Sequence, residues 1–442
     1  MPCTFLHRVL AMISMAMASA VTPADAVPRV LYAAPQGTCD GYPRLQIGLR
    51  NGYCAGLVVG PTAADRTRPM RLPRALLQLD AQHWLVTDLG SWDGANGAVW
   101  MLDTVPGRAA TLTRLLDGLH MPHALAHGPD GMVYVGEMSR IFRFDPLAPD
   151  PAKTIEPIVT GLPDNRLHQN RHPLSKFVFA PDGALLVNVG APSDQCLRLD
   201  GTPPAPICPE AEGGQDAASI RRYYLLSPGR WSDDYTVYAR GLRNSVALAV
   251  HPSGTVLQGE NSYDLATRWF PFDEINVIQA GHHYGWPYCA DVATPTAGWK
   301  TTGAMDCSSD AHTPPRLLLP PHSAPLDMLW YDGAMFPALR GRVLMTWHGH
   351  RSVGGRIVSY ATDANGVPIP DPNPRFPVYG AGPRAYGAQP AADAVVLTPD
   401  WSLVPGVRPQ GSPVGLAIAG DGAIWTTDDR AGLVIRIATD RP

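Results

Sequence analysis

Short apolar runs separated by polar turns recur along the chain, and the clearest case follows the Arg243-Asn244 pair. An apolar run at residues 246–250 leads into a His-Pro-Ser-Gly turn, a second run at 255–258 and a polar segment at 260–264. This pattern predicts two antiparallel strands joined by a tight turn. Because the first strand starts at the end of the hairpin where the second strand finishes, Arg243 should lie beside the 260–264 segment.

The same unit occurs six times after residue 60. The expected strand pairs are 71–77 with 84–88, 121–126 with 132–137, 172–179 with 184–190, 246–250 with 255–258, 325–330 with 342–348, and 413–418 with 423–429. A repeated strand-turn-strand unit predicts a propeller or a solenoid, and closure into a ring leaves only short, protected edges. The spacing exceeds the roughly 40 to 50 residues of a minimal blade, so several blades should carry insertions. We predict an all-β fold, a six-bladed β-propeller.

Composition favours one domain of short strands. A chain of 442 residues would give two or three domains at about 150 residues each, but the repeats span almost everything after residue 60. We therefore assign residues 27–442 to a single propeller domain. The 43 Gly and 46 Pro favour turns over helices. A net charge of -4 is too small to indicate nucleic acid or an anionic membrane as a partner.

Residues 1–26 are typical of a secretory signal peptide. Arg8 supplies a positive charge, residues 9–21 are mostly apolar, and Ala24-Asp25-Ala26 fits the small-residue cleavage rule. A membrane anchor is the alternative, but this apolar run is shorter than the roughly 20 residues that a bilayer requires. We predict cleavage near Ala26, a periplasmic or secreted mature chain, and no stable membrane insertion.

Six cysteines remain after the signal peptide, and they fall into three couples that are close in sequence: Cys39 with Cys54, Cys196 with Cys208, and Cys289 with Cys307. In an oxidising compartment they predict three disulfides that staple loops, although six cysteines allow 15 connectivities. A zinc site is the alternative, but the sequence has no Cys-x-x-Cys pair.

Polar and charged residues gather where the predicted strands begin and end on one face. Strand starts contribute Pro122-His123, His172, Arg243-Asn244, residues 322–325 and Ser412, and strand ends contribute Asp88, Glu137, Gly190, residues 260–264, residues 348–351 and Asp428-Asp429. Histidines, arginines and carboxylates converging on a funnel are typical of a site for a small, polar, anionic ligand. Any single one of them could merely solvate a loop, so the prediction depends on their convergence.

A family resemblance rests on six segments: LRNSVALAVHPSG, ENSYD, DEINVIQAGHHYGWPYC, HPLSKFVFAPDG, HSAPLDMLWYDGAMFP and GDGAIWTTDD. Together they resemble the soluble quinoprotein sugar dehydrogenases, and most closely the sorbosone-dehydrogenase-like branch. The resemblance covers about residues 60–440, and its most specific part is the DEIN…YGWP segment. It implies a periplasmic propeller that uses pyrroloquinoline quinone (PQQ) and calcium.

The resemblance also implies roles for individual residues. His172 occupies the position of the general base that takes the proton of a sugar hydroxyl while hydride passes to the quinone. A histidine suits that task because its pKa lies near operating pH. PQQ carries three carboxylates, which require fixed cations. Its expected partners are Arg243, Asn244, His123, Lys176 and Arg356.

The calcium assignments follow the same resemblance. The carbonyl oxygens of Ser262 and Tyr263 would hold an ion that orients the quinone, and Ser262 and Tyr263 thereby also count as cofactor contacts. A second, structural calcium would use Asp273, Glu274 and the carbonyl of Tyr284. In the absence of the family, the alternative is an acidic pair in a solvated loop.

The sequence departs from the family at three positions. His123 stands where glucose-oxidising relatives have a glutamine, Ala191 where they have an aspartate that orients the catalytic histidine, and Ser412 where an arginine is common. We expect Asp194 to replace that aspartate.

The expected partners are a small sugar, aldose, alcohol or aldehyde substrate and an external electron acceptor, a quinone or a cytochrome. Two alternatives remain open. One is a calcium-dependent propeller hydrolase, such as a lactonase, with Glu137, Asn244 and Asp428 as metal ligands. The other is a propeller that binds without catalysis.

Overall fold

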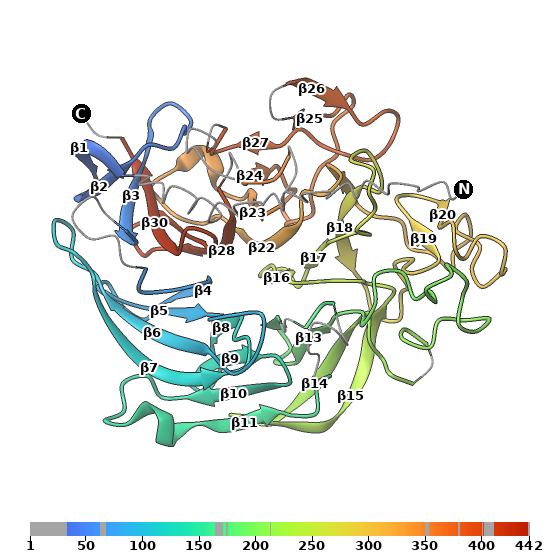
Figure 1. Ribbon diagram of the computed structural model, residues 1–442, viewed down its shortest axis with the longest axis horizontal. Coiled ribbons are helices and arrows are strands. Elements are labelled where there is room, and N and C mark those ends of the chain that lie inside the picture. The colour runs from blue at the N-terminus through green and yellow to red at the C-terminus, as the bar shows by residue number, and fades with distance from the viewer. Residues whose placement is uncertain are drawn as a thin grey trace, which may run out of the picture.

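The computed structural model describes residues 33–61, 68–163, 171–173, 176–212, 214–349, 353–378, 381–399, 401 and 411–440. Five four-stranded antiparallel sheets and one six-stranded antiparallel sheet surround a central axis (Figure 1), which confirms the predicted six-bladed β-propeller. The predicted signal peptide lies outside the described residues. Within the described ranges, no helix is long and apolar enough to cross a membrane.

Each of the first three blades is built from four consecutive strands. Blade 1 contains β4 (Pro73–Gln78), β5 (His83–Asp88), β6 (Gly97–Asp103) and β7 (Thr111–Leu119). Blade 2 contains β8 (Ala124–His127), β9 (Val133–Glu137), β10 (Arg140–Phe144) and β11 (Glu156–Val159), with the 3₁₀ helix η1 (Pro151–Thr154) before β11. Blade 3 contains β12 (Phe177–Phe179), β13 (Leu185–Val189), β14 (Ser219–Ser227) and β15 (Arg230–Arg240).

Blades 4 and 5 carry insertions before their last strands. Blade 4 contains β16 (Ala247–Val250), β17 (Val256–Glu260), β18 (Asp273–Ile278) and β21 (Leu317–Leu319), with the hairpin β19 (Cys289–Ala290) and β20 (Thr294–Pro295) inserted. Blade 5 contains β22 (Pro325–Trp330), β23 (Val343–Trp347), β24 (Arg356–Tyr360) and β27 (Val395–Val396), with η2 (Pro337–Leu339) and the hairpin β25 (Arg375–Val378) and β26 (Ala381–Ala385). In all six blades the first two strands overlap the predicted pairs, although β8 and β12 begin three and five residues later than predicted.

The last blade joins the two ends of the chain. Its strands β28 (Pro413–Ile418), β29 (Ile424–Asp428) and β30 (Leu433–Thr439) come from the C-terminal end, and β3 (Tyr53–Val59) pairs antiparallel with β30. Two more strands, β1 (Ala33–Cys39) and β2 (Tyr42–Leu45), extend this sheet. Arg44 also pairs with Asp440, with a 2.8 Å distance from Nη1 to Oδ1.

The hydrophobic core lies between the blades. Each interface between neighbouring blades has its own cluster of buried apolar side chains. Trp84 of blade 1, for example, stacks on Trp425 of blade 6 with ring centroids 4.1 Å apart. Because the sheets pack face to face in a ring, both faces of a strand such as β5 are buried, and the strand reads as a continuous apolar run.

The three predicted disulfides are confirmed: Cys39–Cys54, Cys196–Cys208 and Cys289–Cys307. The first ties β1 to β3 beside the ring closure. The other two staple the loop between β13 and β14 and the insertion between β18 and β21. Those two segments pack against each other in one cluster with Trp286, Tyr288 and Trp299.

Cys39 and Cys54 are 15 residues apart, and a bond that closes a loop of this length contributes about 3 kcal/mol in the chain-entropy account. We expect the double variant Cys39→Ser/Cys54→Ser to have a lower unfolding midpoint and faster hydrogen exchange of β30 amides. The matched control, Cys196→Ser/Cys208→Ser, should speed exchange in the loop between β13 and β14 and leave β30 unchanged. Unchanged exchange of β30 in the first variant would show that this bond does not support the closure.

Candidate active site

The predicted meeting of Arg243 with the end of β17 is confirmed. In blade 4, Ala247 of β16 pairs with Gly259 of β17, so both segments reach the same end of the sheet. The Asn244 backbone N–H donates to Glu260 Oε1 at 3.0 Å, and Arg243 Nη1 donates to the Asn261 carbonyl at 2.8 Å. This end of the blades carries the remaining candidate residues.

His172 is buried and held by the backbone. Its Nδ1 lies 2.6 Å from the carbonyl oxygen of Ala191. A carbonyl can only accept, so Nδ1 carries the proton and Nε2 carries the lone pair. Burial, reinforced by the Arg243 charge, lowers the pKa of His172 well below its ordinary value. The imidazole is therefore neutral near pH 7 and has a basic nitrogen.

The His172 side chain and the Arg243 backbone both contact one residue, Ala191. The Ala191 carbonyl accepts from His172, and the Ala191 N–H donates to the Arg243 carbonyl at 2.8 Å. These residues enter blades 3 and 4 from loops that are far apart in sequence. The structure thus brings the predicted base and the predicted cofactor arginine together on one face.

Gly190 makes this approach possible. A Cβ atom there would lie 2.5 Å from the His172 Cβ and 2.6 Å from the His172 carbonyl oxygen. Such distances lie well inside van der Waals contact, so a larger residue would push His172 away from Ala191.

Asp194 binds Arg243, and the expectation that it orients His172 gives way to the backbone contact at Ala191. Asp194 Oδ1 accepts from Arg243 Nη2 at 2.6 Å and from Nε at 3.0 Å. Burial raises the pKa of Asp194, but the Arg243 charge and hydrogen bonds outweigh burial, so the pKa falls below its ordinary value. Asp264 adds a second carboxylate, 3.2 Å from Arg243.

The YGWP segment contacts the backbone on both sides of the pair formed by Asp194 and Arg243. Trp286 Nε1 donates to the Asp194 carbonyl at 3.0 Å, and the Trp286 N–H donates to the Gly241 carbonyl at 3.1 Å. The insertion of blade 4 thereby fixes both the aspartate and the loop that leads into Arg243. The most specific motif of the sequence therefore has a structural task next to the site.

Four acidic side chains at strand ends share another structural task. Asp88 accepts from the Arg71 N–H at 2.9 Å, Glu137 from His120, Glu260 from Asn244 at 3.0 Å and Asp428 from Ser412 at 3.1 Å. Each fixes the loop that enters the first strand of its own blade. The sequence predicted these residues as candidate site residues because it locates the strand ends on which they lie but does not reveal their hydrogen-bond partners.

A charged network lies near the axis, and two of its members, Arg74 and Asp327, were not predicted from the sequence. Arg74 Nη1 lies 2.7 Å from Asp429, and His348 Nε2 lies 3.0 Å from the same carboxylate. Lys176 of blade 3 pairs with Asp327 of blade 5 at 2.9 Å. Arg74 and Asp327 sit inside the apolar runs RLPRALL and PLDMLW, and that interruption is the signal that could have found them.

His123 is linked to this network. Arg74 Nε donates to its Nδ1 at 3.2 Å. Burial, then the charges of Arg74 and Lys176, lower the pKa of His123 well below its ordinary value. His123 of blade 2 and Lys176 of blade 3 therefore belong to one charged network, and their contact with a cofactor stays a prediction.

Arg356 begins β24 and is buried. Its Nη1 donates to the carbonyls of Val353 and Gly354, and burial lowers its pKa to about 10. Among the described residues, two polar atoms at strand starts are buried with no hydrogen-bond partner: Asn244 Oδ1 and Ser412 Oγ. Residues 350 and 351 of the 348–351 segment lie outside the described part of the chain.

The residues proposed to bind calcium make separate hydrogen bonds in the structure. The Ser262 N–H donates to Asp273 at 2.9 Å, and the Tyr263 hydroxyl donates to the Pro287 carbonyl at 3.1 Å. Asp273 and Glu274 are consecutive in β18, so their side chains point to opposite faces of the sheet. The Tyr284 hydroxyl donates to the Val277 carbonyl at 2.7 Å.

Glu274 lies opposite Glu260 across the strand pair. Burial, followed by the Glu260 charge, raises the pKa of Glu274 well above its ordinary value, and burial raises the pKa of Glu260 to about 8. Within the described residues, no three His, Cys, Asp or Glu side chains are arranged to hold a metal ion. The calcium sites stay predictions.

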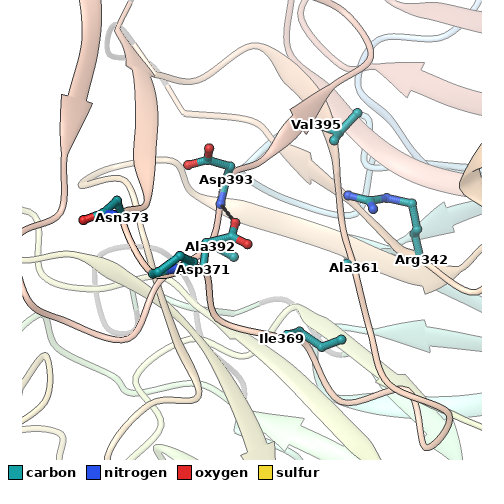
Figure 2. Close-up of a pocket in the computed structure, with 9 residues that line it drawn as sticks. Arg342, Ala361, Ile369, Asp371, Asn373, Ala392, Asp393 and Val395 are labelled. Carbon is teal, nitrogen blue, oxygen red and sulfur yellow. Dashed lines mark hydrogen bonds between the residues drawn. The ribbon is translucent and has the colours of Figure 1, made fainter.

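A cavity outside this face lies in blade 5. It has a volume of about 440 Å³ and is lined by Arg342, Asp371 and Asp393 among others (Figure 2). The Asp393 N–H donates to Asp371, and Arg342 Nε donates to the Ser359 hydroxyl at 3.0 Å. None of the predicted site residues lines this cavity.

Comparison with known proteins supports the family resemblance. Residues 228–354 match the family model described as Glucose / Sorbosone dehydrogenase. This stretch runs from β15 to the loop before β24 and includes Arg243 and the YGWP segment. Comparison with curated proteins gave no match.

Solved structures share the fold. The iodide structure of the Family AA12 carbohydrate-active enzyme from Trichoderma reesei is 20% identical, with a TM-score of 0.65 over 92% of this chain and 100% of that one. The holo PQQ domain of pyranose dehydrogenase from Coprinopsis cinerea is 18% identical, with a TM-score of 0.63 over 91% and 100%. The PQQ-bound aldose sugar dehydrogenase from Streptomyces coelicolor is 18% identical, with a TM-score of 0.54 over 89% and 100%.

Substitution of Gly190 tests the local geometry. We expect Gly190→Ala to displace His172, to shift its imidazole resonances in NMR spectra, and to cost roughly 1 to 3 kcal/mol of stability through overpacking. The matched control is Gly382→Ala, where an added Cβ meets nothing within 4 Å. Identical His172 resonances in Gly190→Ala and the wild type would contradict this geometry.

Proposed function

We propose that this chain is an exported, PQQ-dependent sugar dehydrogenase. Residues 27–442 form its single propeller domain, and the substrate is a sugar, an aldose or a related alcohol or aldehyde. The observation that carries the proposal is the pair of backbone contacts at Ala191, which accepts from the His172 imidazole and donates to the Arg243 carbonyl. The Glucose / Sorbosone dehydrogenase match and the PQQ-bound structural neighbours support the same class.

The residues present fit PQQ. The buried Asn244 Oδ1 has no partner among the described residues, which is the state expected of an amide that meets a ligand. Arg243, Arg356 and Lys176 supply positive charge, and His123 supplies a polar edge near the axis. Bound PQQ would supply an electrophilic quinone carbon that accepts a hydride.

The chain's own residues divide the remaining work. His172 Nε2 takes the proton of the substrate hydroxyl, and the Ala191 carbonyl stabilises the imidazolium that results. Asp194 holds the Arg243 guanidinium in place and cancels part of its charge. Burial excludes water from both groups, which strengthens each of these interactions.

Paired charges set how strongly an anionic cofactor is held. Arg243 is paired with Asp194, Arg74 with Asp429 and Lys176 with Asp327. Arg356 donates to the carbonyls of Val353 and Gly354, and it remains one of the proposed cations of the cofactor site.

Calcium belongs to the proposal as a cofactor held by the carbonyls of Ser262 and Tyr263, and a second ion by Asp273, Glu274 and Tyr284. The hydrolase alternative receives less support from the geometry. It needs Glu137 and Asp428 as metal ligands, but Glu137 binds His120 and Arg140, and Asp428 binds Ser412 and Ala431.

The test is an activity assay of the purified chain reconstituted with PQQ and calcium. We expect dye reduction with aldoses, and a loss of about 10²- to 10⁴-fold in His172→Ala, because a positioned general base contributes that much. PQQ binding, followed by its absorption spectrum, should be nearly unchanged in His172→Ala. Loss of binding together with turnover would show that His172 is structural, and the absence of any spectral change in the wild type would refute the cofactor.

The pKa of His172 predicts the pH profile. Because its folded pKa is lowered below 6.5, the basic form persists into mild acid, so kcat/KM should stay level from pH 8 to 6.5 and fall only below that. The acid limb should disappear from the residual rate of His172→Gln. A limb centred at or above pH 6.5 in the wild type would contradict the assignment.

A further inference from the structure

His123 has its tautomer set by a neighbour. It enters blade 2 with its backbone N–H bonded to the Gly136 carbonyl at 2.8 Å, and its side chain is buried. Arg74 Nε lies 3.2 Å from Nδ1 and can only donate, because a guanidinium keeps its protons. Nδ1 must therefore accept, and the ring proton sits on Nε2.

Arg74 is itself fixed from blade 6. Its Nη1 lies 2.7 Å from Asp429, and both side chains are almost fully buried. The Thr427 hydroxyl donates to the Arg74 carbonyl at 2.6 Å, which holds the backbone of β4 as well. The guanidinium thus has little freedom to turn its Nε away from His123.

His172 shows the opposite arrangement. Its Nδ1 donates to the Ala191 carbonyl, so its Nε2 accepts. The two imidazoles enter neighbouring blades from the same face of the propeller. Protonation of His123 on Nδ1 would place a second positive charge against Arg74, and Arg74 and Lys176 are the cations that oppose it.

We propose that Arg74 is a positioning residue that fixes His123 as a donor through Nε2, opposite to His172, which Ala191 fixes as an acceptor through Nε2. The site would then bind two ligand groups of opposite character. A carbonyl or carboxylate oxygen would accept from His123, and a hydroxyl would donate to His172. The identity of these ligand groups rests on the proposed dehydrogenase function, whereas the two tautomers follow from the hydrogen bonds alone.

The tautomers can be measured without any cofactor. Long-range ¹⁵N–¹H spectra of the ¹⁵N-histidine-labelled full chain at pH 7 distinguish Nδ1-H from Nε2-H, and His123→Gln and His172→Gln assign the two signals. We expect Nε2-H at His123 and Nδ1-H at His172. Nδ1-H, an imidazolium or an even mixture at His123 would overturn the proposal, whatever the enzyme assay shows.

The role of Arg74 is tested by Arg74→Met/Asp429→Asn, which removes both partners of the buried pair and leaves no unpaired charge between them. We expect His123 to lose its single tautomer and its pKa to rise, while His172 keeps Nδ1-H as the internal control. A His123 signal unchanged from the wild type in the folded double variant would show that Arg74 does not set it.

Ligand binding gives a second readout. A glutamine amide can donate from nearly the position of Nε2, so His123→Gln should bind PQQ within about tenfold of the wild type, whereas His123→Leu should bind about 10- to 100-fold more weakly. Equal affinity of the Gln and Leu variants would overturn the donor role. Failure of PQQ to bind the wild type would instead refute the proposed function and leave the tautomer result standing.

Discussion

The antiparallel pairing of β3 with β30 is the constraint on which the rest of the molecule depends. It makes one blade out of both ends of the chain and so closes the ring of sheets. Closure forces the first strands of all six blades to share an axis, and the loops that enter those strands must then meet on one face. Residues far apart in sequence, such as His172 and Arg243, become neighbours for this reason.

Burial near the axis decides the chemistry that the ring can hold. A charge removed from water requires a partner, and the cations of this region have one: Arg74 with Asp429, Lys176 with Asp327, and Arg243 with Asp194. The pair between Lys176 and Asp327 reaches from blade 3 to blade 5, past blade 4. The same burial lowers the pKa of His123 and of His172, which favours the neutral form of both imidazoles.

The sequence predicted the inner half of every blade well, because two buried strands and a turn leave a strong local pattern. The outer strands, the β3 closure and the insertions leave weaker patterns and were not placed. The three disulfides were predicted correctly, and so was the position of Arg243 beside the end of β17, whereas the roles of His172 and Arg243 stay predictions. Arg74 and Asp327 were not predicted, because the role of a charged residue inside an apolar run cannot be inferred until its partner on another blade is known.

Strand-end carboxylates show the converse error. Asp88, Glu137 and Asp428 were predicted as polar residues of the funnel, and their side chains accept hydrogen bonds from the backbone of their own blades. The orienting group of His172 differs again, since it belongs to the main chain of Ala191. Mutation can delete a carboxylate, whereas no substitution at position 191 removes a peptide oxygen. Drift in the side chains around the imidazole can therefore proceed without loss of its tautomer, as long as the path of the backbone is kept.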